Sequence, residues 1–308
     1  MRELKILAVI VVLTLITYWG VEPFAHSQMH PHHEPATFKY DDLPALTKKG
    51  DPKNGAKLFM NAGCVGCHSI KSQGVPAPMD AVSASASYGV NPPDLSMAGA
   101  LYDERFLASY IKNPAHAMKL EHKFNQNRPF PMPNFYGLGG DIDQEVADIV
   151  AYLKSIAPKE VKPKEAFENA CGRCHNMRYD KWTVIGEKPK FKNDIEEKEF
   201  ELKFAKYEAN LKKYLGRIPP DLSMFIRSRG EEYIRDFVED PQKILPGTAM
   251  PRVGLTKEAT YKVIEHIEKV GDRKKDKRNS LGVWVILYFA IFALIAYAWK
   301  QKIWRDIH

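Results

Sequence analysis

The chain has 308 residues, of which 44% are hydrophobic and 11% aromatic, enough to bury the cores of about two domains and too apolar for wholesale disorder. Its formal net charge is +7, but acidic and basic residues alternate along most of the chain, as in KNDIEEKEFELKFAKYEANLKKYLG. Such alternation predicts solvated helix surfaces and not a basic stripe for phosphates, so we expect no nucleic-acid binding.

The first predicted element is an apolar helix at the N-terminus. Ile6–Val21 contains no charged residue and directly follows Lys5. The uncharged stretch is short for a membrane span, but a snorkelling lysine lengthens it. A cleaved secretory signal is the alternative interpretation. We predict an uncleaved transmembrane anchor over residues 1–22, followed by a linker over residues 23–47.

Two runs of helical pattern follow, and the second repeats the first. The first run contains YDERFLASYIKNP and DIDQEVADIVAYLKSIAP, whose apolar residues recur at helical spacing. The second run contains the matching segments RGEEYIRDFVEDP and TKEATYKVIEHIEKVG. The hexapeptide PPDLSM occurs in both, at Pro92–Met97 and at Pro219–Met224. We therefore predict two copies of one small helical domain, over residues 48–158 and 159–272.

The second copy is longer than the first because of a charged insertion. The extra residues lie at 185–216, ahead of the second PPDLSM. A surface for docking a partner and a solvated spacer fit this composition equally well.

The last predicted element is a membrane span near the C-terminus. Leu281–Trp299 is long enough to cross a bilayer, and Trp284 and Trp299 occupy interfacial positions. We assign residues 273–308 to this helix and a short tail. Counting basic residues around this helix alone would put its near end in the cytoplasm. The first helix usually sets the topology, however, so we place residues 22–280 outside.

All four cysteines lie in two short motifs, CVGCH and CGRCH. Cys-x-x-Cys-His is the attachment sequence of a c-type haem, because cysteines about one helical turn apart reach the two vinyl groups and the histidine reaches the iron. A four-cysteine zinc site, a thioredoxin-like pair and structural disulfides are the alternatives, and none explains the two histidines. We predict two covalently bound c-type haems. The residues that would hold them are Cys64, Cys67, His68, Cys171, Cys174 and His175.

Each haem iron also needs a ligand on its other face. Both copies offer a Met-Pro ahead of a Gly-Leu, in FPMPNFYGL with Met132 and in TAMPRVGL with Met250. Methionine opposite histidine gives an electron carrier of relatively high potential, whereas an open face binds peroxide or another small ligand. We predict Met132 and Met250 as the distal ligands, with Met118 as the rival in the first copy. Met97 and Met224 are expected to pack in the core.

Two kinds of supporting contact are also predicted. Arg128 and Arg252 flank the proposed methionines, and arginine pairs well with planar carboxylates, so we expect them to contact haem propionates. A solvated surface arginine is the alternative at both positions. The prolines of each PPDLSM are expected to offer a backbone carbonyl to the free ring nitrogen of the ligand histidine.

The second copy and the C-terminal end resemble cytochrome c1, the haem subunit of the quinol–cytochrome c oxidoreductase, or bc1 complex. The motifs that carry the resemblance begin near Lys164 and run to the C-terminus. They are CGRCHNMRYDKW, IPPDLSMFIRSRGEEYIRDFVEDP, AMPRVGL and the basic DRKKDKRNSLGVW before the span. With its additional first haem domain, the chain is similar to the dihaem cytochrome c1 of some bacteria, whose paired domains resemble cytochrome c4. The resemblance implies His175 as proximal ligand and Met250 as distal ligand.

The same resemblance implies a fold and a function. The fold is all-α, with two tandem class I cytochrome c-type haem domains between an N-terminal hydrophobic anchor and a C-terminal transmembrane helix. The chain would accept electrons from the Rieske iron–sulfur subunit, beside cytochrome b, and pass them to a soluble cytochrome c or a terminal oxidase. Its haem domains would lie on the periplasmic side of a bacterial inner membrane, with no catalytic centre of their own.

Two other functions remain open at the level of sequence. One is a dihaem subunit of a cytochrome oxidase, which is also an anchored electron relay. The other is a dihaem enzyme, such as a peroxidase or a thiosulfate-oxidising cytochrome. The enzyme requires one haem with an open or unusual sixth position, so the two distal methionines distinguish it from a relay.

Overall fold

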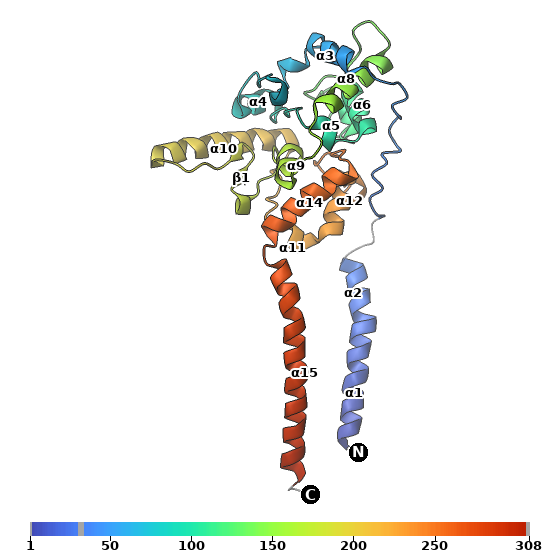
Figure 1. Cartoon of the computed structure of the whole chain (residues 1–308), viewed down its shortest axis with the longest axis vertical. Coiled ribbons are helices and arrows are strands. Elements are labelled where there is room, and N and C mark those ends of the chain that lie inside the picture. The colour runs from blue at the N-terminus through green and yellow to red at the C-terminus, as the bar shows by residue number, and fades with distance from the viewer. Residues whose placement is uncertain (1, 30–33, 306–308) are drawn as a thin grey trace. The chain divides into compact units, whose positions relative to one another are not determined.

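The computed structural model of the protein describes residues 2–29 and 34–305, which are largely helical (Figure 1). Their packing separates one unit within residues 1–37 from a second that begins at Phe38. The strands are short and pair antiparallel, with Trp182 opposite Glu187. The predicted all-α class, with apolar helices near both ends, is confirmed. Residues 30–33 of the predicted linker lie outside the described part of the chain.

The N-terminal unit is one apolar helix with a π-helical turn in it. Pro23 has no N–H to donate, and the N–H of Glu22 bonds to the carbonyl of Thr17, which widens the helix at this point. The helix continues beyond residue 22 into the segment expected to be linker. Leu4–Gln28 is long and apolar enough to cross a membrane. The segments are α1 (Arg2–Ile16), η1 (Thr17–Val21) and α2 (Glu22–Met29).

The first copy is organised around two helices that cross at close range. Asp51 and Asp141 cap the N-termini of α3 and α8 with their side chains. A Cβ added at Gly55 would lie 1.9 Å from the carbonyl oxygen of Asp148, so only glycine allows the two helices to pack this closely. The helices are α3 (Pro52–Asn61), η2 (Cys64–Gly66), η3 (Lys71–Gln73), α4 (Ala81–Tyr88), α5 (Ala98–Leu101), α6 (Glu104–Lys112), α7 (Pro114–Ala117) and α8 (Ile142–Ile156).

The second copy repeats this order, with α9 and α14 packed together as α3 and α8 are. Its core includes Phe167 and Ile267, which are almost completely buried. The elements are α9 (Pro163–Ala170), η4 (Arg178–Asp180), β1 (Trp182–Thr183), β2 (Gly186–Glu187), α10 (Asp194–Leu215), α11 (Phe225–Arg229), α12 (Glu231–Glu239), α13 (Pro241–Ile244) and α14 (Lys257–Gly271).

The charged insertion forms part of the β1–β2 hairpin and the long helix α10, which packs against α4 of the first copy (Figure 1). Asn210 Nδ2 donates to Ser85 Oγ across this contact at 3.0 Å. Near the start of α10, Ile195 is 79% exposed, so that end is solvated. The insertion is therefore more than a spacer, because its C-terminal half joins the two copies. The residues of α10 that are buried are Tyr207, Leu211 and Leu215.

Further contacts between the copies come from residues far apart in sequence. The N–H of Asp103 donates to the carbonyl of Gly254 at 2.9 Å, beside a bridge that pairs Tyr102 with Leu255. Tyr40, which precedes the first copy, is buried, and its hydroxyl donates to the carbonyl of Leu255 at 2.6 Å. The two copies therefore pack into one body in which their sites are held next to each other.

The C-terminal helix α15 runs from Lys275 to Arg305 and contains the predicted span. None of its described residues is buried, and it is long and apolar enough to cross a membrane. Its apolar side chains therefore have no protein cover within the described residues, which is the arrangement that a lipid-facing helix requires.

His266 on α14 is expected to make the stability of the second copy depend on pH. Its ring packs against Phe167, with centroids 5.2 Å apart, and its Nε2 lies 3.2 Å from Asp180 Oδ2. Burial lowers the pKa of His266, although the charge of Asp180 opposes this shift. The folded protein thus keeps the ring neutral while the unfolded chain takes up a proton near pH 6.5. The stabilising contribution of the neutral His266 is therefore fully present above that pH and is lost progressively below it.

Denaturant unfolding at several pH values tests this expectation. Between about pH 6.5 and 5.5, the wild-type free energy of unfolding should fall more than that of His266→Gln, by at most about 1.4 kcal/mol for one proton. His116→Gln is the control, because this histidine is exposed and half of its side chain is in solvent. Equal pH profiles for the wild type and His266→Gln would contradict the expectation.

Candidate haem-binding site

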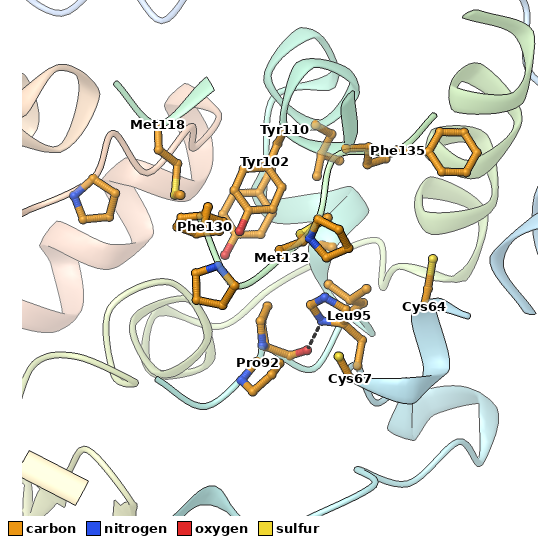
Figure 2. A pocket seen from close by; sticks show the side chains of 18 of the residues that line it. Cys64, Cys67, Pro92, Leu95, Tyr102, Tyr110, Met118, Phe130, Met132 and Phe135 are labelled. Atoms are coloured by element: carbon orange, nitrogen blue, oxygen red, sulfur yellow. Dashed lines mark hydrogen bonds between the residues drawn. The ribbon is translucent and has the colours of Figure 1, made fainter. Parts of the chain in front are cut away.

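Both Cys-x-x-Cys-His motifs open into one cavity of about 470 Å³. Its walls are largely apolar and aromatic, and they include Phe59 and Tyr102. In Figure 2, Met132 lies between Cys64 and Cys67 on one side and Phe130 on the other. The motif residues that line the cavity are Cys64, Cys67, His68, Cys171, Cys174 and His175.

Each cysteine motif adopts the single helical turn that its spacing predicts. The N–H of His68 donates to the carbonyl of Cys64 at 2.9 Å, and that of His175 donates to the carbonyl of Cys171 at the same distance. Gly63, with φ of +75°, lets the chain turn from α3 into the first motif. Within the described residues, the cysteine pairs do not meet in a group that suits a metal ion, which disfavours the four-cysteine zinc site.

The hexapeptide PPDLSM holds the histidine of each Cys-x-x-Cys-His motif through a proline carbonyl, as predicted. His68 Nδ1 lies 3.0 Å from the carbonyl oxygen of Pro93, and His175 Nδ1 lies 2.9 Å from that of Pro220. A ring that donates its Nδ1–H to a carbonyl keeps Nε2 unprotonated and fixes its direction, which is what an iron ligand needs.

The aspartate and serine of the hexapeptide fix the loop that follows each motif, a role that our sequence reasoning missed. In each copy the aspartate accepts from the N–H three residues after the ligand histidine, and the serine hydroxyl accepts from the next N–H. These bonds are Lys71 N to Asp94 Oδ2 (3.2 Å), Arg178 N to Asp221 Oδ2 (3.0 Å), Ser72 N to Ser96 Oγ (3.0 Å) and Tyr179 N to Ser223 Oγ (3.1 Å). The exact repetition of the hexapeptide was the signal that could have revealed them.

The two predicted distal methionines, Met132 and Met250, both line the cavity. Met118 also lines the cavity, but in Figure 2 Phe130 lies between Met118 and the cysteines. Its carbonyl accepts the N–H of Arg252 at 3.1 Å, which places it at the contact between the copies. This position favours Met132 over Met118 as the distal ligand of the first copy.

The methionines of the two hexapeptides differ from each other. Met97 is partly buried and packs against the second copy, where its sulfur accepts from Asn169 Nδ2 at 3.5 Å. Met224 is 44% exposed, and its sulfur accepts from the Tyr179 hydroxyl. The expectation of core packing is therefore wrong for Met224, because in the second copy this turn faces solvent.

Arg252 fits a carboxylate group in the cavity that it lines. The residue is 2% exposed, and its Nη1 lies 2.8 Å from both carboxylate oxygens of Asp42. Burial alone would raise the pKa of Asp42, but the hydrogen bond and charge of Arg252 hold it below its usual value. Nη2 of Arg252 is buried and has no hydrogen-bond partner among the described residues. A haem propionate would satisfy this donor.

Arg128 occupies a different environment, at the end of α10. Its Nη2 donates to the carbonyl of Tyr214 at 2.7 Å, and its guanidinium lies 5.2 Å from the centre of the Phe124 ring. Arginine at this position stabilises the last carbonyls of a helix. A propionate contact from Arg128 stays a prediction.

A helical fold around a cavity lined by two Cys-x-x-Cys-His turns, carbonyl-bonded histidines and methionines has the features expected of a c-type cytochrome. Residues 52–157, which make up most of the first copy, match the cytochrome c family. Among solved structures, a chain of a "Hyperthermophilic respiratory Complex III" is 28% identical to this one, with a TM-score of 0.38. That similarity covers 47% of this chain and 75% of the other. The comparison with curated proteins gave no match.

Proposed function

We propose that this chain is a membrane-anchored electron carrier with two c-type haems, which accepts electrons from a Rieske iron–sulfur protein and passes them to a soluble cytochrome c or a terminal oxidase. The observation that carries the proposal is the cavity lined by both Cys-x-x-Cys-His motifs and by the two proposed distal methionines, Met132 and Met250. When bound, haem supplies one-electron oxidation and reduction.

The residues of the chain have three tasks in this function. Cys64 and Cys67 in the first copy, like Cys171 and Cys174 in the second, would hold a haem through thioether bonds. Proline carbonyls orient the two histidines, and the apolar walls of the cavity exclude water. Burial and ligand type then set the potential, so no acid, base or nucleophile is required.

The positions of the methionines favour a relay over a dihaem enzyme. Met132 and Met250 each lie on the same cavity as the motif of their own copy. Filling the sixth position with a thioether leaves no site for peroxide or a sulfur substrate at the iron. We therefore retain the peroxidase or thiosulfate-oxidising enzyme only as the alternative that the spectroscopic test below would support.

The proposed partners and location rest on the two apolar helices and on the resemblance of the second copy to cytochrome c1. Leu4–Gln28 and Lys275–Arg305 would anchor the chain in a bacterial inner membrane, with the haem domains on the periplasmic side. Cytochrome b and the Rieske subunit would be its neighbours. The second-copy haem would receive the electron, because that copy carries the resemblance, and the first-copy haem would pass it on.

Purification of the full chain from its own membranes in mild detergent tests the assignment to this complex. We expect a b-type cytochrome and a Rieske cluster to copurify, and a quinol to reduce the c-type haems. Copurification with the copper-containing subunits of an oxidase would support the cytochrome oxidase alternative instead. Peroxidase turnover by the isolated chain would contradict the relay.

A further inference from the structure

Arg173 is a residue of the second attachment motif whose side chain reaches the first copy. It lies between Gly172 and Cys174 and lines the shared cavity. Its Nη1 donates to the carbonyl of Asn91 at 2.9 Å. Asn91 directly precedes the two prolines whose second carbonyl holds His68. The guanidinium thus crosses from one copy to the proximal side of the other copy's site.

A closed set of hydrogen bonds fixes this crossing. The Tyr207 hydroxyl donates to the carbonyl of Arg173 at 2.9 Å and accepts the N–H of Asn91 at 3.1 Å. With the bond from Arg173 Nη1 to Asn91, these hydrogen bonds join each of the residues Arg173, Asn91 and Tyr207 to the other two. Tyr207 is completely buried on α10, so the charged insertion serves as a positioning element for Arg173.

The charge of Arg173 has no anionic partner in the part of the chain that the structure describes. Its Nε is buried without a hydrogen-bond partner, and it forms no ion pair with any of the residues that the structure describes. The groups that its charge acts on include Cys174 and three tyrosines of the cavity wall, Tyr102, Tyr110 and Tyr214. Burial raises the pKa of Tyr110 to about 12, and the positive charge of Arg173 opposes that rise, so these phenols stay neutral. An arginine remains protonated, and a partly buried guanidinium without an anionic partner is unfavourable.

Arg173 and Arg252 therefore each line the cavity with one buried guanidinium nitrogen that has no hydrogen-bond partner among the described residues. Arg252 lies two residues after Met250, the methionine proposed as distal ligand of the second copy. Arg173 contacts Asn91 of the first copy, so its free donor is available to the first site.

We propose that Arg173 binds a propionate carboxylate of the haem held by Cys64 and Cys67, so that the attachment motif of one copy supplies the counter-charge for the haem of the other. The proposal rests on the two-haem function above. An arginine paired with a propionate neutralises a negative charge close to the iron and so favours the reduced state. Arg173 would therefore keep the potential of the first-copy haem high.

The test is a spectroelectrochemical titration of the full chain with Arg173→Gln. We expect the equilibrium constant for reduction of the first-copy haem to fall about tenfold, which lowers its midpoint potential by about 59 mV for one electron. The midpoint potential of the second-copy haem should change much less. Met132→His labels the first-copy haem, because replacing methionine by histidine moves its midpoint far below the other. Arg227→Gln is the matched control, since that arginine lies exposed on α11.

Unchanged midpoints in Arg173→Gln, or a shift of the second-copy haem alone, would overturn the proposal. If Arg173→Gln does not accumulate with haem, Tyr207→Phe provides the test, because it leaves the attachment motif intact. In Tyr207→Phe we expect a smaller fall in the midpoint potential of the first-copy haem. An unchanged midpoint potential in this variant would also count against the proposal. A wild-type chain with fewer than two haems would instead refute the proposed function.

Discussion

Replacing Met250 by alanine is expected to leave both haems covalently attached and to lower the midpoint potential of one of them strongly. A thioether stabilises ferrous haem relative to water or an empty position, so its loss favours the oxidised state. We expect the equilibrium constant for reduction of this haem to fall at least about a hundredfold, which lowers its midpoint potential by about 120 mV for one electron. The near-infrared band of methionine bound to ferric haem should lose about half of its intensity.

Met224→Ala is the control for this substitution. Both residues are methionines of the second copy, but Met224 is 44% exposed and lies on the turn that follows the second PPDL. Met224→Ala should leave the midpoint potentials of both haems and the near-infrared band unchanged. Full band intensity in Met250→Ala would exclude Met250 as a ligand and leave the second-copy haem without its proposed distal partner.

Replacing Gly254 by alanine is expected to destabilise the contact between the copies by about 3 kcal/mol, from a left-handed backbone and an overpacked interface. Gly254 has φ of +74°, and an added Cβ would lie 2.0 Å from the ring of Phe106 in the first copy. The carbonyl of Gly254 also accepts the N–H of Asp103, so any shift breaks this bond. Denaturant unfolding of the full chain, followed by haem absorbance, measures the loss.

Gly247→Ala separates the two causes of this loss. Gly247 has φ of +78°, but nothing lies within 4 Å of its added Cβ. It should therefore cost only the backbone contribution of about 1 kcal/mol. Equal losses for both alanine substitutions would show that the contact with Phe106 does not carry the effect.

The local parts of the fold and site were predictable because they depend on residues close together in sequence. Cysteine spacing dictates the helical turn of each motif, and Pro93 and Pro220 were expected to hold the histidines. Capping residues such as Asp51 and Asp141 mark the helix starts. Repetition of one hexapeptide indicated that both copies use the same arrangement.

The contacts between the copies were not predictable from one sequence, because they join residues with no local pattern. Tyr207 lies in a segment whose alternating charges indicate a solvated helix, yet it is completely buried. Its position follows from packing against α4, which the charge pattern does not encode. Arg173 occupies a position in the motif that any residue type can take, and only its contact with Asn91 gives it a role. Met224 illustrates the opposite error, an apolar residue that the fold leaves exposed.

A redox titration of the purified wild-type chain, combined with haem quantification and near-infrared spectra, tests the central claim most directly. We expect two covalently bound haems per chain, both low-spin, both with the methionine-to-ferric-haem band and both at relatively high potential. A single haem, or one haem that is high-spin and lacks this band, would contradict a two-haem relay and favour the dihaem enzyme or a one-haem cytochrome.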